Sequence, residues 1–456
     1  MLNPVDAPRK AGRSRFSTFV SYLQWVARGG NGSAAVANTF LVKIIILGIN
    51  LLTGIIAARG LGPGGRGITV AVALWPAIVS GALTFGLPAA FEYRARRAPE
   101  ERDELFTTAI VLGATAGCIA AAVGAFLVIP HVLHHYSPDA IHFAQGMMVF
   151  APQIMIYNLM NGLLNVRGEF SRSNFLWLVA NTATLTVQTV LLLTHRFDPF
   201  SNGLAYFSPA LIVTSFVAFR VRSSFRWTRG FRRRTKSLAS YGIRVYGLEL
   251  LNTFSGQIDQ TLVVGLLSAV SFGLYTTSLN VTRMLNVIQS SINPVLFPKA
   301  ASLATDEALP LIARAARISL VLTTFGAIGF LIVTPFLVPF FYGEAFASVI
   351  PITRVLTIES VVVGYIGVLS QTFMATGRPG LITILQVAGL LTSVPLMLLL
   401  IPRLGLLGAA LALLGSSTIR GALLLYCFPM VLKRPVPRLL PMLSDARYVI
   451  GRLRHI

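Results

Sequence analysis

The chain contains few charged residues, and acidic residues are the scarcest of them. Of 456 residues, 16 are Asp or Glu and 38 are Lys or Arg, which gives a formal net charge of +22, yet charged residues make up only 12%. The mean hydropathy of +0.72 lies outside the range of ordinary soluble proteins. The composition therefore excludes a soluble globular protein.

Cysteine is also scarce. The two cysteines, Cys118 and Cys427, both lie in apolar segments, so the sequence predicts no disulfide framework and indicates no redox compartment. The polar and basic residues before the first apolar segment lack the short apolar core and cleavage site of a signal peptide. We expect residues 1–33 to form a basic amphipathic tail on the membrane surface.

Catalytic motifs are missing as well. The sequence contains no GxxxxGK[ST] phosphate loop, no GxSxG elbow and no HExxH helix. The loops between apolar segments are short and hold few carboxylates. His131, His134 and His135 cluster in one loop, but only Asp139 stands near them, so we expect a solvated loop and no metal site. An enzyme is therefore the weakest hypothesis.

Apolar residues are abundant and make up 54% of the chain. Apolar runs of 18 or more residues recur along the sequence, and each is long enough to cross a bilayer as a helix. We predict an all-α polytopic membrane protein with about 12 transmembrane helices. The predicted spans are residues 34–58, 68–92, 105–129, 141–165, 174–194, 203–221, 243–267, 273–297, 311–334, 351–375, 381–401 and 405–428.

The basic residues predict the topology. Four lie within spans and four lie in the loops of one side, whereas 30 of the 38 lie in the loops and tails of the other side. Lys and Arg collect in cytoplasmic loops, so both termini are predicted to be cytoplasmic, and no nucleic-acid partner is needed to explain the charge. The longest such segment, 222–242, is predicted to be a basic linker at the lipid surface; capture of an anionic head group or a partner enzyme is the alternative.

Matching features at a single offset indicate a duplicated half. At an offset of 206 residues the sequence repeats four features, which are Gly67 and Gly273, Pro88 and Pro294, Leu105 and Leu311, and Arg172 and Arg378. We therefore predict two six-helix lobes, related by a pseudo-two-fold axis, around a central cavity. Residues 34–221 form the predicted N-lobe, 243–428 the C-lobe, and 429–456 a second basic cytoplasmic tail.

Several charges fall within the predicted spans, where they are costly and usually face a protein interior or a wet cavity. Arg283 lies ten residues into its span, too deep to reach the interface. It either pairs structurally with Asp259 or faces a cavity and contacts an anionic cargo. Lys43 and Glu249, which are also 206 residues apart, either reach the interface or form an ion pair across the lobes that gates transport.

Five motifs resemble those of a known family. They are ARGLGPGGRG (58–67), GLPAAFEYRAR (86–96), QIDQTLVVGLLSAVSFGLY (257–275), FYGEAF (341–346) and LGLLGAALA (404–412). Their order and spacing, across residues 34–428, are similar to the polysaccharide-transporter family of oligosaccharide-lipid flippases. That family belongs to the superfamily that also holds multidrug/toxin-extrusion antiporters and lipid II flippases.

The resemblance implies a protein of the bacterial inner membrane that flips an undecaprenyl-diphosphate-linked oligosaccharide by alternating access, for exopolysaccharide, O-antigen or capsule assembly. It implies a cationic cavity, for which the matching substrate-binding candidates are Arg283, Lys43, Arg59 and Arg66. Membrane lipids, a polysaccharide polymerase and a chain-length regulator are the expected partners.

The acidic candidates are Asp259, Glu249 and Glu359, which are expected to gate transport or to couple it to H⁺ or Na⁺; no other cofactor is expected. The second span holds no basic residue, unlike that of lipid II flippases, which favours export of a surface polysaccharide unit over a peptidoglycan role. Two other functions stay open. One is a cation-coupled multidrug exporter, and the other is a non-transporting scaffold of a polysaccharide-assembly complex.

Overall fold

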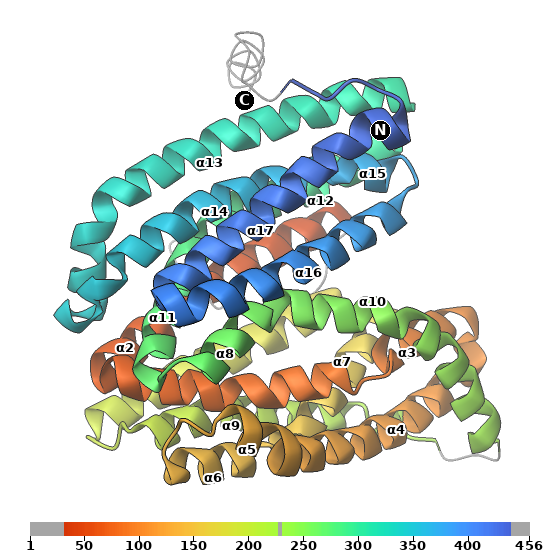
Figure 1. The fold of residues 1–456 in the computed structure, drawn as a ribbon. Coiled ribbons are helices and arrows are strands. Elements are labelled where there is room, and N and C mark those ends of the chain that lie inside the picture. Colours follow the sequence, from red (N-terminus) through yellow and green to blue (C-terminus); the bar gives the residue numbers. More distant parts are fainter. Residues whose placement is uncertain (1–31, 227–229, 439–456) are drawn as a thin grey trace, which may run out of the picture.

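The computed structural model describes residues 32–226 and 230–438, which form helices gathered into two lobes (Figure 1). The helices of the N-lobe are α2 (Gly32–Ala82), α3 (Leu87–Arg97), α4 (Arg102–Val123), α5 (Ile129–Val132), α6 (Pro138–Met147), α7 (Phe150–Val166), α8 (Phe170–Leu193) and α9 (Pro199–Arg220). Those that follow are α10 (Phe231–Leu266), α11 (Ala269–Thr282), α12 (Val287–Ala301), α13 (Thr305–Tyr342), α14 (Ile350–Leu369), α15 (Gln371–Ala375), α16 (Pro379–Leu404) and α17 (Leu406–Cys427).

Within the described ranges, nine helical segments are long and apolar enough to cross a membrane. One of them, Leu41–Ala82, covers most of the first two predicted spans, because α2 joins two helices across a kink at Gly62, where φ is 65°. The second predicted span, 68–92, is wrong at its end, because α2 stops at Ala82 and α3 begins at Leu87. The other two predicted spans lie in α10 and in α11 with α12. Helix α10 starts with a run of basic residues, and α11 is separated from α12 by a 3₁₀ turn at Arg283–Asn286. The predicted all-α architecture of about 12 spans in two lobes is confirmed.

The lobes touch through backbone at the end of the molecule where α2 is kinked. A Cβ atom at Gly67 of α2 would overlap the carbonyl oxygen of Ala269, at the start of α11. A Cβ atom at Gly273 of α11 would overlap the carbonyl oxygen of Pro63. Only glycine permits this approach, because any other residue would place a side-chain atom inside a neighbouring peptide.

At the other end, α10 begins within the predicted linker and packs on the N-lobe. Residues 222–242 are helical from Phe231 onward. Arg234 of α10 is buried and forms an ion pair of 2.6 Å with Glu104 of α4, and the rings of Tyr93 and Tyr241 stack at 4.1 Å. The first part of α10 is therefore attached to α3 and α4.

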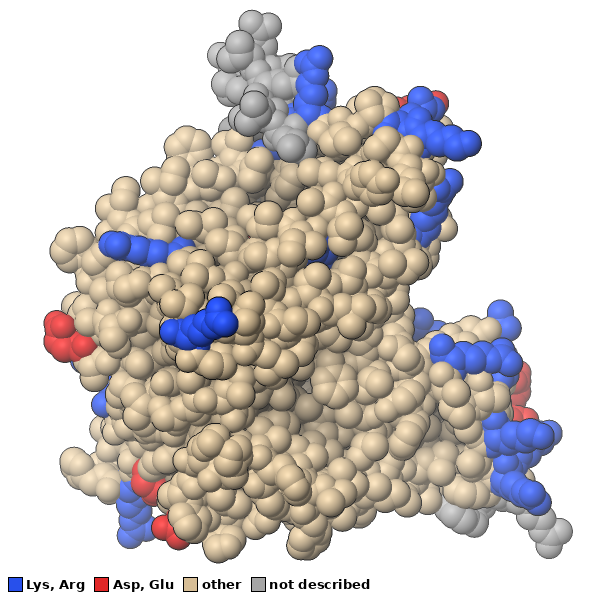
Figure 2. Space-filling view, in the orientation of Figure 1, with Lys and Arg blue, Asp and Glu red and all other residues tan. Residues whose placement is uncertain are grey.

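The space between the lobes opens at this second end. Figure 2 shows a notch on the right-hand side of the molecule, with Lys and Arg side chains on both rims. In the same orientation, Figure 1 places α3 and the first turns of α10 on that side, opposite the kink of α2. The described conformation is thus closed at the Gly67–Gly273 end and open at the basic end.

Candidate functional site

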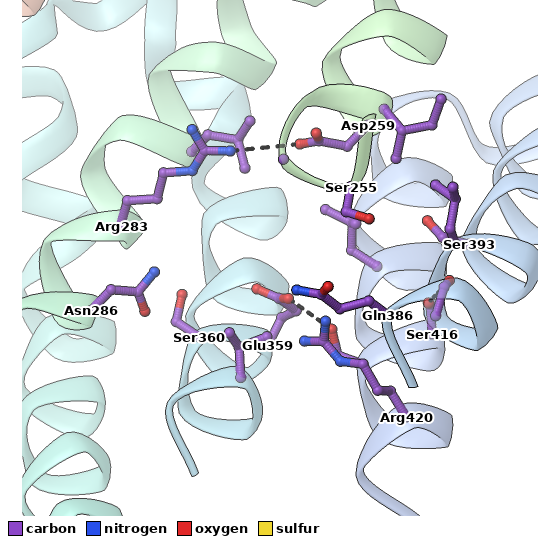
Figure 3. Close-up of a pocket in the computed structure, with 18 of the residues that line it drawn as sticks. Ser255, Asp259, Arg283, Asn286, Glu359, Ser360, Gln386, Ser393, Ser416 and Arg420 are labelled. Carbon is purple, nitrogen blue, oxygen red and sulfur yellow. Dashed lines mark hydrogen bonds and ion pairs between the residues drawn. The ribbon is translucent and has the colours of Figure 1, made fainter. Parts of the chain in front are cut away.

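A polar cavity of about 280 Å³ lies inside the C-lobe, among α10, α11, α14, α16 and α17 (Figure 3). Four charged residues line it: Asp259, Arg283, Glu359 and Arg420. Its uncharged polar residues are Ser255, Thr282, Asn286, Ser360, Gln386, Ser393, Ser416 and Ser417. The notch of Figure 2 opens between the lobes at the edge of the molecule, whereas the cavity that holds these four charged residues lies within one lobe.

Asp259 and Arg283 face each other across one side of this cavity. Asp259 is 5% exposed, and its Oδ2 atom accepts a hydrogen bond of 3.1 Å from the hydroxyl of Tyr275. Arg283 Nη2 lies 4.0 Å from the same oxygen, and the Arg283 side chain is 46% exposed. Arg283 thus lies beside Asp259 and also borders the cavity with a half-exposed side chain, whereas its contact with an anionic cargo stays a prediction.

The position of Arg283 follows from local structure. Helix α11 ends at Thr282, and the chain continues as a 3₁₀ turn before α12 begins at Val287. A stretch of 3₁₀ helix inside a longer helix often marks a hinge or a sequence under strain. Arg283 therefore lies where the span changes from α-helix to 3₁₀ helix.

Glu359 and Arg420 form a second group of opposite charges. Glu359 of α14 accepts a hydrogen bond of 2.9 Å from the hydroxyl of Ser417 on α17. Arg420, one turn further along α17, points toward Glu359 in Figure 3. Its Nε atom is buried and has no hydrogen-bond partner within the described part of the chain. Arg420 is one of the four basic residues within the predicted spans, but its position beside Glu359 depends on how α14 packs against α17, which the sequence does not show.

Arg59 and Arg66 lie away from this cavity, at the closed end. Arg59 Nε donates a hydrogen bond of 2.9 Å to the carbonyl oxygen of Phe341, at the end of α13. Arg66 is 2% exposed, donates to the carbonyl oxygen of Gly54, and lies with its guanidinium carbon 5.6 Å from the ring centre of Tyr342. Both predicted substrate ligands are therefore engaged near the contact between α2 and α13 in this conformation.

Lys43 and Glu249 also lie outside the cavity. Lys43 is exposed on α2. Glu249, on α10, accepts a hydrogen bond of 3.2 Å from the hydroxyl of Thr84, in the turn between α2 and α3. No ion pair joins Lys43 to Glu249 in the described conformation of residues 32–226 and 230–438. Glu249 instead connects α10 to the N-lobe.

The fold and the cavity define a polytopic, all-helical, two-lobed membrane protein. The chain belongs to the polysaccharide biosynthesis protein family, because the model of that family matches residues 56–351. A membrane protein of Methanocaldococcus jannaschii, described as uncharacterized, is 22% identical over 318 residues, which are 65% of this chain and 74% of the relative. The predicted family resemblance is confirmed.

Solved structures share the fold at low sequence identity. The lipid II flippase MurJ in an inward closed conformation has a TM-score of 0.70 and 14% identity, covering 85% of this chain and 86% of its own. An inward-facing multidrug resistance MATE family transporter of the MOP superfamily has a TM-score of 0.65 and 15% identity, covering 86% and 98%. Both are similar in architecture, so the architecture alone does not separate a lipid cargo from a drug.

Proposed function

We propose that the protein is a flippase that moves an undecaprenyl-diphosphate-linked oligosaccharide across the bacterial inner membrane, for exopolysaccharide, O-antigen or capsule assembly. The observation that carries the proposal is the position of Arg283. It is a half-exposed guanidinium deep within a span, at a polar cavity, in a chain of the polysaccharide biosynthesis protein family. A membrane protein keeps such a charge where it has a function.

The chemistry of a diphosphate fits this position. An anion that enters a low-dielectric passage must exchange its water for other donors, and a guanidinium presents five N–H donors in a planar fork that matches phosphate oxygens. Asp259 lies near one of these nitrogens, at 4.0 Å, and its buried carboxylate keeps the guanidinium in place. Arg283 can therefore be held by the protein and still bind a phosphate.

In alternating access, the boundary between the lobes would open and close in turn at its two ends. In the described conformation the Gly67–Gly273 end is closed, and the notch at the basic end admits cargo from the side predicted to be cytoplasmic. Arg59 and Arg66 donate to backbone carbonyls at the closed end. Arg66, which is buried, would become available to the diphosphate only after the lobes separate there, whereas Arg59 is already exposed.

The acidic candidates are assigned to coupling or gating. Asp259 and Glu359 lie in the cavity, where binding of H⁺ or Na⁺ would change its charge. Glu249 bonds to Thr84 across the boundary between α10 and α2, which suits a gating role. Membrane lipids, a polysaccharide polymerase and a chain-length regulator remain the proposed partners, and both termini are proposed to be cytoplasmic.

A cation-coupled multidrug exporter is the second candidate. The likeness to the MATE transporter and the two carboxylates in the C-lobe cavity favour it. The basic residues Arg283 and Arg420 oppose it, because a cationic drug would meet them in the same cavity. A non-transporting scaffold is the third candidate; in that case changes of charge in the cavity would leave polysaccharide assembly intact.

Flipping in proteoliposomes tests the proposal. A fluorescent undecaprenyl-diphosphate oligosaccharide is followed between leaflets for wild type, Arg283→Ala and Arg354→Ala, with and without an ion gradient. Arg354 is an exposed arginine of α14 that does not line the cavity, so it is the matched control. We expect at least a tenfold loss of rate in Arg283→Ala alone, the equivalent of about 1.4 kcal/mol.

Each other outcome has its own meaning. Wild-type flipping that both variants retain would keep the function and remove Arg283 from the site. Export of cationic drugs without flipping of the lipid would favour the exporter. Absence of both activities, together with normal polysaccharide assembly by Arg283→Ala cells, would favour the scaffold.

A further inference from the structure

We propose that the C-lobe cavity is a saccharide subsite, which receives one neutral sugar ring of the lipid-linked oligosaccharide. This inference rests on the proposed function and assigns a part of the substrate to the cavity. The sequence alone could not select residues that recognise the sugar, because both lipid-facing and cavity-facing positions of the spans are mostly apolar. The tertiary structure brings eight uncharged polar residues from separate helices to one place.

The size of the cavity suits a single ring. Its volume of about 280 Å³ lies at the lower edge of the roughly 300–1,000 Å³ that small-molecule sites occupy. A whole oligosaccharide exceeds that space. One ring entering from the side of Arg283 does not.

Several polar groups of the cavity wall have no partner in the protein. The hydroxyls of Ser255 and Ser393 and the Nε atom of Arg420 are buried without a hydrogen-bond partner in the described residues. Ser393 is 5% exposed, so the protein largely covers it. Buried polar groups in proteins nearly always have hydrogen-bond partners, and in a cavity these can come from an occupant or from water.

The chemistry of the wall favours sugar hydroxyls. Serine hydroxyls and the amides of Asn286 and Gln386 both donate and accept hydrogen bonds, as the hydroxyl groups of a sugar do. Figure 3 shows these amides pointing into the space between Arg283 and Arg420. No aromatic side chain is among the described residues that line the cavity, so it lacks the apolar rings that hold drug-like cations.

The charges of the cavity balance one another. Asp259 lies 4.0 Å from Arg283, and Glu359 is opposed by Arg420. With both carboxyls ionised, the two carboxylates and two guanidiniums leave no net charge, which fits a neutral ring better than a metal cation or a second anion. A diphosphate bound at the exposed part of Arg283 would place the first sugar toward the serine-rich wall formed by α16 and α17 (Figure 3).

The test fills the cavity without removing a polar group. Gly256 lines the cavity, and a Cβ atom there meets no other atom within 4 Å, so Gly256→Leu adds bulk in open space. Gly329→Leu is the matched control, because Gly329 has the same open surroundings on α13 and does not line the cavity. Both changes replace a helical glycine and favour the helix.

Binding is measured with full-length protein in nanodiscs. The probes are sugar-free undecaprenyl diphosphate and undecaprenyl diphosphate that carries one hexose or one N-acetylhexosamine. For wild type and Gly329→Leu we expect at least one sugar-bearing probe to bind about tenfold more tightly than the sugar-free lipid, as two or three hydrogen bonds would give. In Gly256→Leu this advantage should fall below about threefold, while the affinity for the sugar-free lipid stays unchanged.

A second pair of variants removes hydroxyls instead. Ser393→Ala should reduce the sugar advantage, whereas Ser319→Ala should retain it, because Ser319 is equally buried and unpartnered but lies outside the cavity. A thermal unfolding curve for each variant separates loss of binding from loss of fold.

Three results would overturn the subsite. They are the absence of any sugar advantage in wild type, an advantage that survives in Gly256→Leu, and a Gly256→Leu defect confined to Na⁺ dependence when NaCl replaces choline chloride. The last result would assign the cavity to a cation. Failure of wild type to bind even the sugar-free lipid would instead contradict the proposed function, so the two failures are distinguishable.

Discussion

Gly67 of α2 and Gly273 of α11 lie against each other across the lobe boundary. A Cβ atom built on Gly273 would lie 2.9 Å from the backbone nitrogen of Gly67. These two glycines are also the first matched pair in the sequence repeat at an offset of 206. A pseudo-two-fold arrangement predicts that equivalent residues of the two halves can meet at the axis that relates them, so this contact supports the predicted duplication.

Gly67→Ala should prevent closure at this end. The new methyl group would overlap the carbonyl oxygen of Ala269, so we expect the population to shift toward lobes that are separated there. Spin labels at His195 and Ser268 would report the separation as a longer distance. Gly64→Ala is the control, because a Cβ atom there makes an ordinary 3.5 Å contact with Val270. An unchanged distance in Gly67→Ala would show that the glycine contact does not limit closure.

Asp259→Asn should remove the response of transport to an ion gradient. The change keeps the shape of the side chain but removes the carboxylate that faces Arg283 at 4.0 Å. We expect flipping driven by the lipid gradient to continue and the stimulation by a proton or sodium gradient to disappear. Asp306→Asn, at an exposed carboxylate of α13 outside the cavity, should keep the stimulation. Equal stimulation in both variants would exclude Asp259 as the coupling residue.

Glu104→Ala should destabilise the attachment of α10 to the N-lobe. The Arg234 side chain is 6% exposed and lies 2.6 Å from the Glu104 carboxylate. Removal of the acidic partner of a buried arginine costs about 2 kcal/mol or more. We expect a lower midpoint of thermal unfolding in detergent, and no comparable change for Glu100→Ala, since Glu100 is exposed. A matching midpoint for both variants would contradict the structural role of the pair.

Asp198 should give helix α9 a pH-dependent cap. Partial burial raises the pKa of the carboxyl, but hydrogen bonds from the backbone of Ser201 and Phe200 and from the Ser201 hydroxyl outweigh it, so the pKa is lowered. The stabilisation is therefore present above the unfolded-state pKa of about 3.9 and is lost as the pH falls through the lower folded-state value. Asp198→Ala should cost about 1 kcal/mol at neutral pH.

Thermal unfolding at several pH values checks this prediction. The difference between wild type and Asp198→Ala should be full at pH 6 and should shrink as the pH approaches 3. Asp139→Ala serves as a control at an aspartate that lies in the first turn of α6 and is not the cap, because the side chain of Ser137 caps that helix. A difference that grows as the pH falls would contradict the sign of the effect.

Much of the architecture could be predicted because local sequence patterns determine it. Runs of apolar residues identified the spans, and the break at Gly62 and the polar start of α10 altered only how the helices are divided. Arg283 and Asp259 were predicted as candidate site residues because charged residues are rare inside membrane spans. Arg420 is also a charged residue inside a span, but its position beside Glu359 of α14 depends on how the helices pack.

The sequence by itself determined that this is a polytopic helical membrane protein and to which family it belongs, and it predicted two matching halves. These properties follow from hydropathy, spacing and motifs along the chain. Only the tertiary structure decided that Arg59 and Arg66 donate to backbone carbonyls at the closed end and that the polar cavity lies within the C-lobe. The physical reason is that lipid and protein interior are both apolar. The lipid-facing and protein-facing residues of a span therefore have similar compositions, and only the packing of neighbouring helices distinguishes them.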